Sequence, residues 1–151
     1  MSGQISARDV MGTARTPAFA TETVWNAGLV GTGATSEGRS LTVGHQGEWT
    51  PEHLLLLAAE SCFMSTLLTL ASAADIAVLG YVSSGHLDMP GDVRLAPSVS
   101  LCPCIVVATE RDAERVAACA KQAEMESAVA RLLGSRVQIS LEVRVVPANG
   151  G

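Results

Sequence analysis

The sequence predicts an α+β fold with a largely antiparallel sheet, a long central helix and a second helix. Two observations lead to this prediction. Segments rich in β-branched residues, some with strict alternation of apolar and polar residues, surround two segments with helical character. A strong helix start at Thr50-Pro51-Glu52 opens the longer helical segment. Separate runs of strands and helices, in the order meander, helix, two strands, helix, strand, are typical of the α+β class.

The first predicted elements are strands. Residues 23–31 have the β-branched and aromatic content of a strand, and residues 40–44 have the pattern of a returning strand. Between them, residues 35–38 (TSEG) form a turn signal. We therefore expect an N-terminal antiparallel meander.

The long helix is predicted to run from Pro51 to about Ala74. Thr50 can cap it, proline suits the first helical position, and Glu52 favours the positive end of the helix dipole. The segment is apolar enough to resemble a membrane span, but Glu60 stands near its centre among several Ser and Thr residues. A central helix buried by a partner subunit fits this composition better.

The second half of the chain is predicted to contain two strands, a helix and a last strand. Residues 90–92 (PGD) form a turn between the first two strands, and Gly134 stands where the helix would end. The predicted ranges are 76–89 and 93–109 for the two strands, 112–133 for the helix and 137–146 for the last strand.

Length and composition favour a single domain that forms a homodimer. The chain has 151 residues, of which 48% are hydrophobic and only 3% aromatic, and its mean hydropathy is +0.30. We assign residues 1–22 to a lead-in, 23–147 to the domain and 148–151 to a tail, and we interpret the apolar excess as a subunit interface. A net charge of −5 and a single lysine argue against nucleic acid and against an anionic membrane surface as partners.

The cysteines are Cys62, Cys102, Cys104 and Cys119. Residues 1–21 lack the pattern of a secretory signal, so we expect a cytoplasmic location and no structural disulfides. Cys102 and Cys104 are expected to pack in the core. They lack the usual two-residue spacing and a second ligand pair for zinc, and the three histidines form no helical pair. We therefore expect no metal and no cofactor.

The helix start and the cysteine that follows it resemble the OsmC/Ohr family (osmotically induced and organic-hydroperoxide-resistance proteins). The family pattern Asn-Pro-Glu-x-Leu, small residues, Cys-Phe stands here as Thr50-Pro51-Glu52-His53-Leu54 followed by Ser61-Cys62-Phe63. The strand LCPCIV at residues 101–106 and the segment GSRVQI at residues 134–139 also fit. The resemblance covers about residues 23–146.

The resemblance implies the OsmC-like fold as an intertwined homodimer with active sites at the subunit interface. It also implies reduction of organic hydroperoxides by a pair of cysteines. It makes Cys62 the equivalent of the thiol that attacks the peroxide, and Glu52 the equivalent of the carboxylate that organises the site.

Two departures from the family pattern change the expected mechanism. The family's second cysteine falls at Ser127 when the chain is aligned back from Gly134, and serine cannot form the disulfide. The family arginine of the N-terminal meander has no equivalent at residues 29–34, and Arg39 is the nearest candidate. Cys119 lies two helical turns before Ser127 and is a poor substitute, so an external thiol is the simpler reductant.

Helix geometry adds a further constraint on the two site residues. Glu52 and Cys62 are ten positions apart, or about 15 Å along an unbroken helix, so they cannot meet within it. If they act together, either the helix breaks between them or Glu52 comes from the partner subunit. Glu60 points roughly away from Cys62 and is assigned no role.

Two functions remain open from the sequence. The first is a hydroperoxide reductase of one-cysteine type, with Cys62 as nucleophile, Glu52 as organiser and an apolar pocket lined by Leu, Met and Phe63. The alternative is a non-enzymatic OsmC-like dimer that binds a small apolar ligand in its interface cavity. The retained Cys62 and Glu52 favour the first function, whereas the missing second cysteine favours the alternative.

Overall fold

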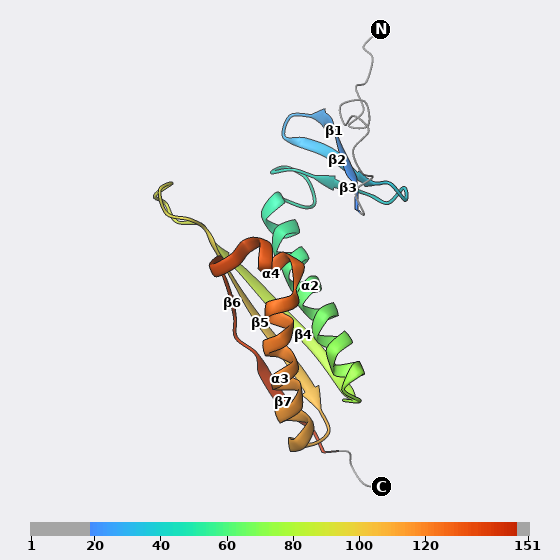
Figure 1. Cartoon of the computed structure of the whole chain (residues 1–151). Helices are drawn as coiled ribbons and strands as arrows, with labels where there is room; N and C mark the ends of the chain where they lie inside the picture. The colour runs from blue at the N-terminus through green and yellow to red at the C-terminus, as the bar shows by residue number, and fades with distance from the viewer. Residues whose placement is uncertain (1–18, 148–151) are drawn as a thin grey trace, which may run out of the picture. The chain divides into compact units, whose positions relative to one another are not determined.

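A computed structural model describes residues 19–147, and the chain divides into two compact units, residues 1–54 and 55–151 (Figure 1). Each unit is treated by itself below. Most of the predicted lead-in, residues 1–18, and the predicted tail, residues 148–151, lie outside the described residues. Residues 19–147 confirm the α+β class predicted from the sequence: helices and two separate sheets are present.

The first unit contains a three-stranded antiparallel sheet in the order β1-β2-β3. Its strands are β1 (Thr21–Ala27), β2 (Val30–Thr35) and β3 (Ser40–Val43). The meander was therefore predicted correctly, but the single strand expected over residues 23–31 is wrong. Gly28 has φ of +57°, and this left-handed conformation turns the chain between β1 and β2.

Helix α2 (Pro51–Ala73) begins where the sequence predicted. The Thr50 hydroxyl accepts a hydrogen bond from the backbone N–H of His53 at 3.4 Å, and the Thr50 carbonyl accepts from Leu54 at 3.1 Å. One stripe of the helix, formed by Ala59, Phe63, Leu67 and Ala71 at four-residue spacing, is buried. By length and composition α2 could cross a membrane, although the central helices of water-soluble proteins share these properties.

The second unit is built on a sheet in which β5 is the central strand. β4 (Val78–Asp88) pairs antiparallel with β5 (Ser98–Val107). On the other side of β5, β6 (Val137–Ile139) and β7 (Glu142–Val145) pair with it in parallel. The single last strand predicted over residues 137–146 is thus interrupted. β6 and β7 run parallel to β5 because a helical crossover connects β5 to them.

The helical crossover consists of α3 (Glu110–Glu126) and α4 (Ala128–Leu133), followed by the short 3-10 turn η1 (Gly134–Arg136). The sequence predicted one helix over residues 112–133, but the chain breaks at Ser127, whose ψ of 120° is not helical. Thr109 caps α3 through a hydrogen bond from the Asp112 N–H. The guanidinium of Arg115 donates to the carbonyl oxygen of Ala74 and so ties α3 to the chain just after α2.

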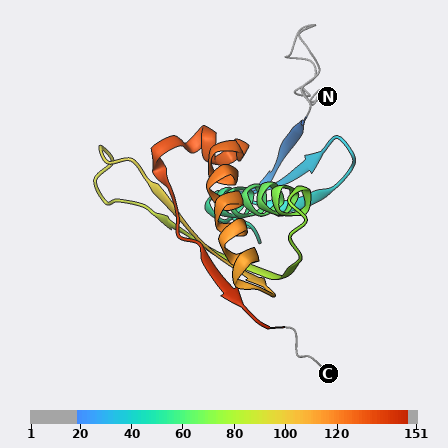
Figure 2. The same ribbon diagram turned by 60° about the horizontal axis from the view of Figure 1, so that its bottom comes forward.

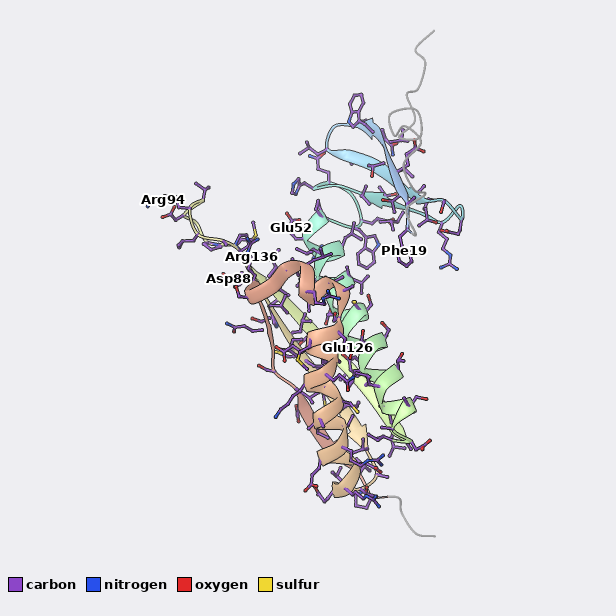
Figure 3. All side chains as sticks on the ribbon, in the orientation of Figure 1. Phe19, Glu52, Asp88, Arg94, Glu126 and Arg136 are labelled. Carbon is purple, nitrogen blue, oxygen red and sulfur yellow. The ribbon has the colours of Figure 1, made fainter. Side chains whose placement is uncertain are left out.

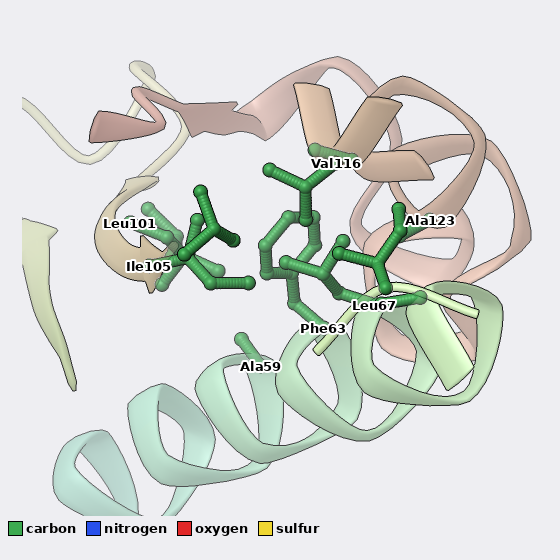
Figure 4. Close-up of a cluster of buried hydrophobic side chains, with 12 residues drawn as sticks. Ala59, Phe63, Leu67, Leu101, Ile105, Val116 and Ala123 are labelled. Carbon is green, nitrogen blue, oxygen red and sulfur yellow. The ribbon is translucent and has the colours of Figure 1, made fainter. Parts of the chain in front are cut away.

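The core of the second unit lies between the sheet and the two long helices. Figure 2 shows α2 and α3 crossing on one side of this sheet, while the β4–β5 hairpin extends beyond them. Figure 4 shows the packed side chains: Phe63 and Leu67 of α2 meet Val116 of α3 and Ile105 of β5. All four are at most 1% exposed. The packing fixes the rotation of α2 about its axis, which decides where Cys62 points.

Candidate active site around Cys62

Cys62 lies on α2, one residue before the buried Phe63, and points to the break between α3 and α4. The Ser127 hydroxyl donates a hydrogen bond to the Cys62 sulfur, with Oγ and Sγ 3.2 Å apart. Two residues 65 positions apart in the chain therefore meet. Ser127 is the position to which the family resemblance assigned the missing second cysteine, and the structure places its side chain directly against the thiol.

Ser127 is held rigidly at the helix break. It is completely buried. Its backbone N–H donates to Ala123 O at 2.8 Å, and its carbonyl accepts from the N–H of Arg131 at 2.9 Å. The residue therefore ends one helix and starts the next, and its hydroxyl remains available for Cys62. A fixed donor of this kind is preorganised for a charge on sulfur.

The surroundings of Cys62 favour the thiolate. Burial by itself raises the pKa of the thiol, but hydrogen bonds from the Ser127 hydroxyl and from the backbone N–H groups of Val129 and Ala128 lower it by more. The net result is a Cys62 pKa below the ordinary value for cysteine. Ala128 and Val129 belong to the first turn of α4, so the helix break supplies all three groups that lower the Cys62 pKa. These backbone groups were not found by sequence reasoning, because their role depends on where α4 begins.

Glu52 lies in the first turn of α2, where Figure 3 labels it. Hydrogen bonds from its own backbone N–H and from the Thr50 hydroxyl hold its pKa below the usual value. Since α2 continues unbroken to Ala73, the first of the two possibilities raised by the sequence, a helix break between Glu52 and Cys62, is not present. Ten positions correspond to about 15 Å along the helix, so Glu52 does not reach the Cys62 sulfur of its own helix.

The other candidates from the sequence lie away from the Cys62 sulfur or outside its unit. Cys102 and Cys104 are on the face of β5 opposite to Leu101, Pro103 and Ile105, which are buried under the helices. The expectation of core packing is wrong for Cys102, which is exposed. Arg39 is an exposed residue of the first unit, just before β3.

A hollow of about 260 Å³ lies between α2 and the end of α3. It is lined by Ser65, Thr66, Thr69, Leu70 and Glu126. Thr66 follows Cys62 by one helical turn, and Glu126 precedes Ser127, so the hollow adjoins the thiol. Three of its five lining residues carry hydroxyl groups, and Phe63, which is 1% exposed, belongs to the core and does not line the hollow. The apolar pocket expected at the subunit interface remains a prediction.

Glu60, which was assigned no role, lies against β4. A Cβ placed on Gly85 would come within 3.1 Å of its carboxyl carbon, so the absent side chain of Gly85 makes room for it. Glu60 Oε1, Tyr81 Oη and Ser83 Oγ are buried and have no hydrogen-bond partner among the described residues. Burial raises the pKa of Tyr81, the Ser83 hydroxyl opposes this shift, and the charge of Glu60 adds to it. The contact with β4 confirms that Glu60 points away from Cys62.

The fold agrees with the comparisons to known proteins. The family model described as OsmC-like protein matches residues 44–142, and the chain therefore belongs to the OsmC family. No curated protein matches the chain. Over residues 19–147, no group of three or more His, Cys, Asp or Glu side chains is arranged to hold a metal ion.

Three solved structures illustrate the likeness. An OsmC-like protein of unknown function from Vibrio cholerae is 14% identical, with a TM-score of 0.72, covering 83% of this chain and 99% of that one. An organic hydroperoxide resistance protein OsmC from Legionella pneumophila is 16% identical, with a TM-score of 0.64 and coverage of 87% and 99%. The organic hydroperoxide resistance protein OhrB of Bacillus subtilis is 16% identical, with a TM-score of 0.62 and coverage of 83% and 97%. At these identities the likeness establishes the fold.

Replacing Ser127 by alanine is expected to raise the pKa of Cys62 and to slow its reactions at neutral pH. The substitution removes the side-chain donor, and a hydrogen bond to a charged group contributes about 1.5 kcal/mol, so we expect a roughly three- to tenfold slower alkylation. The measurement is the rate of iodoacetamide labelling of Cys62 against pH, followed by peptide mass spectrometry.

The matched control for this measurement is Ser65→Ala. The Ser65 hydroxyl lies one turn from Cys62 but donates to the backbone carbonyls of Ser61 at 2.8 Å and Cys62 at 3.1 Å, and not to the Cys62 sulfur. Its loss should leave the pH profile of Cys62 labelling unchanged. An unchanged profile in Ser127→Ala would show that the Ser127 hydroxyl does not stabilise the thiolate.

Replacing Ser127 by cysteine is expected to create a disulfide with Cys62. The present Oγ–Sγ separation of 3.2 Å leaves only a small shift to the S–S bond length of about 2.05 Å. Oxidation should lower the intact mass by two hydrogens, and the linked peptides should be found by digestion. Ser72→Cys, exposed near the end of the same helix, is the control and should form no such link. Failure of Ser127→Cys to cross-link would contradict the geometry of the site.

Proposed function

We propose that the protein reduces organic hydroperoxides with Cys62 as its single reacting cysteine. The observation that carries this proposal is the hydrogen bond from Ser127 Oγ to Cys62 Sγ at 3.2 Å, together with the two backbone donors of α4. These groups favour the thiolate, which is the nucleophilic form of cysteine. The names of the Legionella and Bacillus proteins, both organic hydroperoxide resistance proteins, support the substrate class.

The reaction needs one thiolate and one peroxide. The Cys62 sulfur attacks the terminal oxygen of the hydroperoxide, the O–O bond breaks, and an S–O bond forms. The departing alkoxide takes up a proton and leaves as the alcohol, while Cys62 becomes a sulfenic acid. The sulfur is oxidised by two electrons and the peroxide is reduced by two. The Ser127 hydroxyl and the α4 amides also point toward the negative charge on the sulfenate that forms.

An external thiol completes the cycle. A first thiol attacks the sulfenic acid to give a mixed disulfide and water, and a second thiol releases Cys62. Over residues 19–147 no internal substitute lies at the sulfur. Ser127 occupies the position next to it, Cys102 and Cys104 lie on the opposite face of the sheet, and Cys119 lies two turns before Ser127 on α3. The four free cysteines suit a reducing compartment, so we assign this cycle to the cytoplasm.

A second copy of the chain is proposed to complete the site. Only 22% of the apolar window of α2 is buried within the chain, and Leu57 remains 47% exposed. Among the described strands, β4 is the end strand of its sheet and pairs with β5 alone, so its other long edge is available for pairing with a second copy. A helix that is apolar on several sides is stable when a partner covers it. In the homodimer we assign Glu52 of the second copy to the organisation of Cys62.

Oxidation by a hydroperoxide tests the proposed reaction. Treatment of the reduced protein with one equivalent of cumene hydroperoxide should add one oxygen to the intact mass within seconds. A large excess of external dithiol should then remove that oxygen. Cys62→Ser should gain no oxygen at this rate, and Cys119→Ser, the control, should behave like wild type. Oxidation that is equally fast in Cys62→Ser, or absent in wild type, would overturn the proposal.

Mixed dimers test the origin of Glu52. Glu52→Gln and Cys62→Ser homodimers should each show low peroxidase turnover with a dithiol reductant. In a mixed dimer, the Cys62 of the Glu52→Gln chain meets the Glu52 of the Cys62→Ser chain, which gives one intact site. Turnover should therefore return to about half the wild-type value per dimer. If mixing restores nothing while the mixed species is present by native mass spectrometry, Glu52 does not act across the interface.

A further inference from the structure

The open face of the second sheet carries a pair of thiols that the proposed peroxidase reaction does not use. Cys102 and Cys104 alternate with the buried Leu101, Pro103 and Ile105 along β5, so both point to the face that no helix covers. Cys102 is exposed and Cys104 is half-buried, and both are free thiols. Their β4 neighbours, Ser84 and Val82, are exposed on the same face.

The spacing of the two thiols disfavours a disulfide. Two residues apart on a strand, their Cβ atoms lie about 6.6 Å apart, whereas a disulfide needs Cβ atoms within about 4.5 Å. Oxidation to a direct bond would therefore require the central strand of the sheet to buckle. The two residues therefore remain separate thiols that point to the same face of the sheet.

The same spacing suits a metal ion held between two sulfurs. With a metal–sulfur bond of about 2.3 Å, two sulfurs on opposite sides of an ion are about 4.6 Å apart. Each sulfur has to lean about 1 Å toward the other, which rotation about the Cα–Cβ bonds allows. Zinc is disfavoured because it takes four ligands, and no third His, Cys, Asp or Glu is suitably placed among the described residues. The remaining candidate is a soft monovalent ion that binds two thiolates.

We propose that Cys102 and Cys104 form a two-coordinate site for Cu(I) on the open face of the sheet. Binding replaces two S–H protons by one metal ion: two thiols and Cu⁺ give a bis-thiolate complex of charge −1 and two protons. Copper enters and remains as Cu(I), so no electron is transferred. The site is on the opposite side of the sheet from Cys62, and the two kinds of thiol chemistry are separate.

An ion pair on the neighbouring strand is compatible with the charge of this complex. Strand β7 lies next to β5, with Glu142 opposite Cys104 and Arg144 one pair further along on the same face. The Arg144 guanidinium donates to the Glu142 carboxylate, with Nε and Oε1 2.6 Å apart, and Glu142 is the residue opposite Cys104 in the strand register. The complex of charge −1 would therefore form beside a neutral ion pair and not beside an unpaired carboxylate.

Access to the pair is open on its other flank. The pairing along β5 is interrupted between Leu101, which pairs with Ile139 of β6, and Cys104, which pairs with Glu142 of β7. Cys102 lies at this interruption, where no strand residue pairs with it on that side. An incoming copper donor can thus reach Cys102 first, and the half-buried Cys104 then supplies the second sulfur ligand.

Competition for Cu(I) tests the proposal. The reduced full-length protein is titrated without oxygen against the coloured Cu(I) complex of bathocuproine disulfonate. This ligand binds Cu(I) too tightly for a single weak thiol to compete. Wild type should withdraw one Cu(I) per chain. Cys102→Ser and Cys104→Ser should each bind at least tenfold more weakly, whereas the control Cys119→Ser should match wild type. Circular dichroism of each variant establishes that the fold is retained.

Protection from alkylation gives a second readout on the unmodified protein. One equivalent of Cu(I) should slow iodoacetamide labelling of Cys102 and Cys104 and leave labelling of Cys119 unchanged. Zn(II) at the same concentration should protect neither cysteine. The proposal is overturned if wild type withdraws no copper, if it withdraws one ion per two chains, or if either single variant keeps the wild-type affinity. Equal loss of affinity in Cys119→Ser would also overturn it.

Discussion

The packing of one stripe of α2 against β5 and α3 is the constraint on which the second unit depends. Phe63 and Leu67 fill the space between the sheet and α3, and both are essentially unexposed. Because side chains on a helix keep fixed angular relations, this packing sets the direction of every other residue of α2. Cys62, the residue before Phe63, points toward the junction of α3 and α4, and Glu60 points toward β4. The hydrophobic core therefore orients the Cys62 thiol.

The break at Ser127 places hydrogen-bond donors next to the Cys62 sulfur. A continuous helix over residues 110–133 would keep the N–H groups of Ala128 and Val129 in its own hydrogen bonds. The non-helical ψ of Ser127 frees them and places a hydroxyl beside the same sulfur. The pKa of Cys62 falls although burial alone would raise it, and no arginine takes part among the hydrogen bonds that cause the shift.

The two faces of the sheet separate the cysteines of the chain by environment. The covered face, through α2, holds a thiol surrounded by hydrogen-bond donors at a helix junction. The open face holds the Cys102–Cys104 pair, with the ion-paired Glu142 opposite Cys104 on β7. The strict alternation of β5 produces this separation, since successive side chains of a strand point to opposite sides. The one-residue spacing that excludes a zinc motif is the same spacing that puts both thiols on one face.

Local sequence signals determined the α+β class, the start of α2 at Pro51 and the turn-strand character of the N-terminal unit, whereas Cys62 was singled out through the family resemblance. The first three features depend on capping, proline and periodicity, which act over a few residues. Ser127 was located only through the family resemblance, and its contact with Cys62 became evident only in the fold, because 65 residues separate them. The tertiary structure also decided the parallel pairing of β6 and β7, the burial of Phe63 and the exposure of Cys102. Each of these features depends on which distant segments pack together. The free energy of that packing cannot be read from a local stretch of sequence.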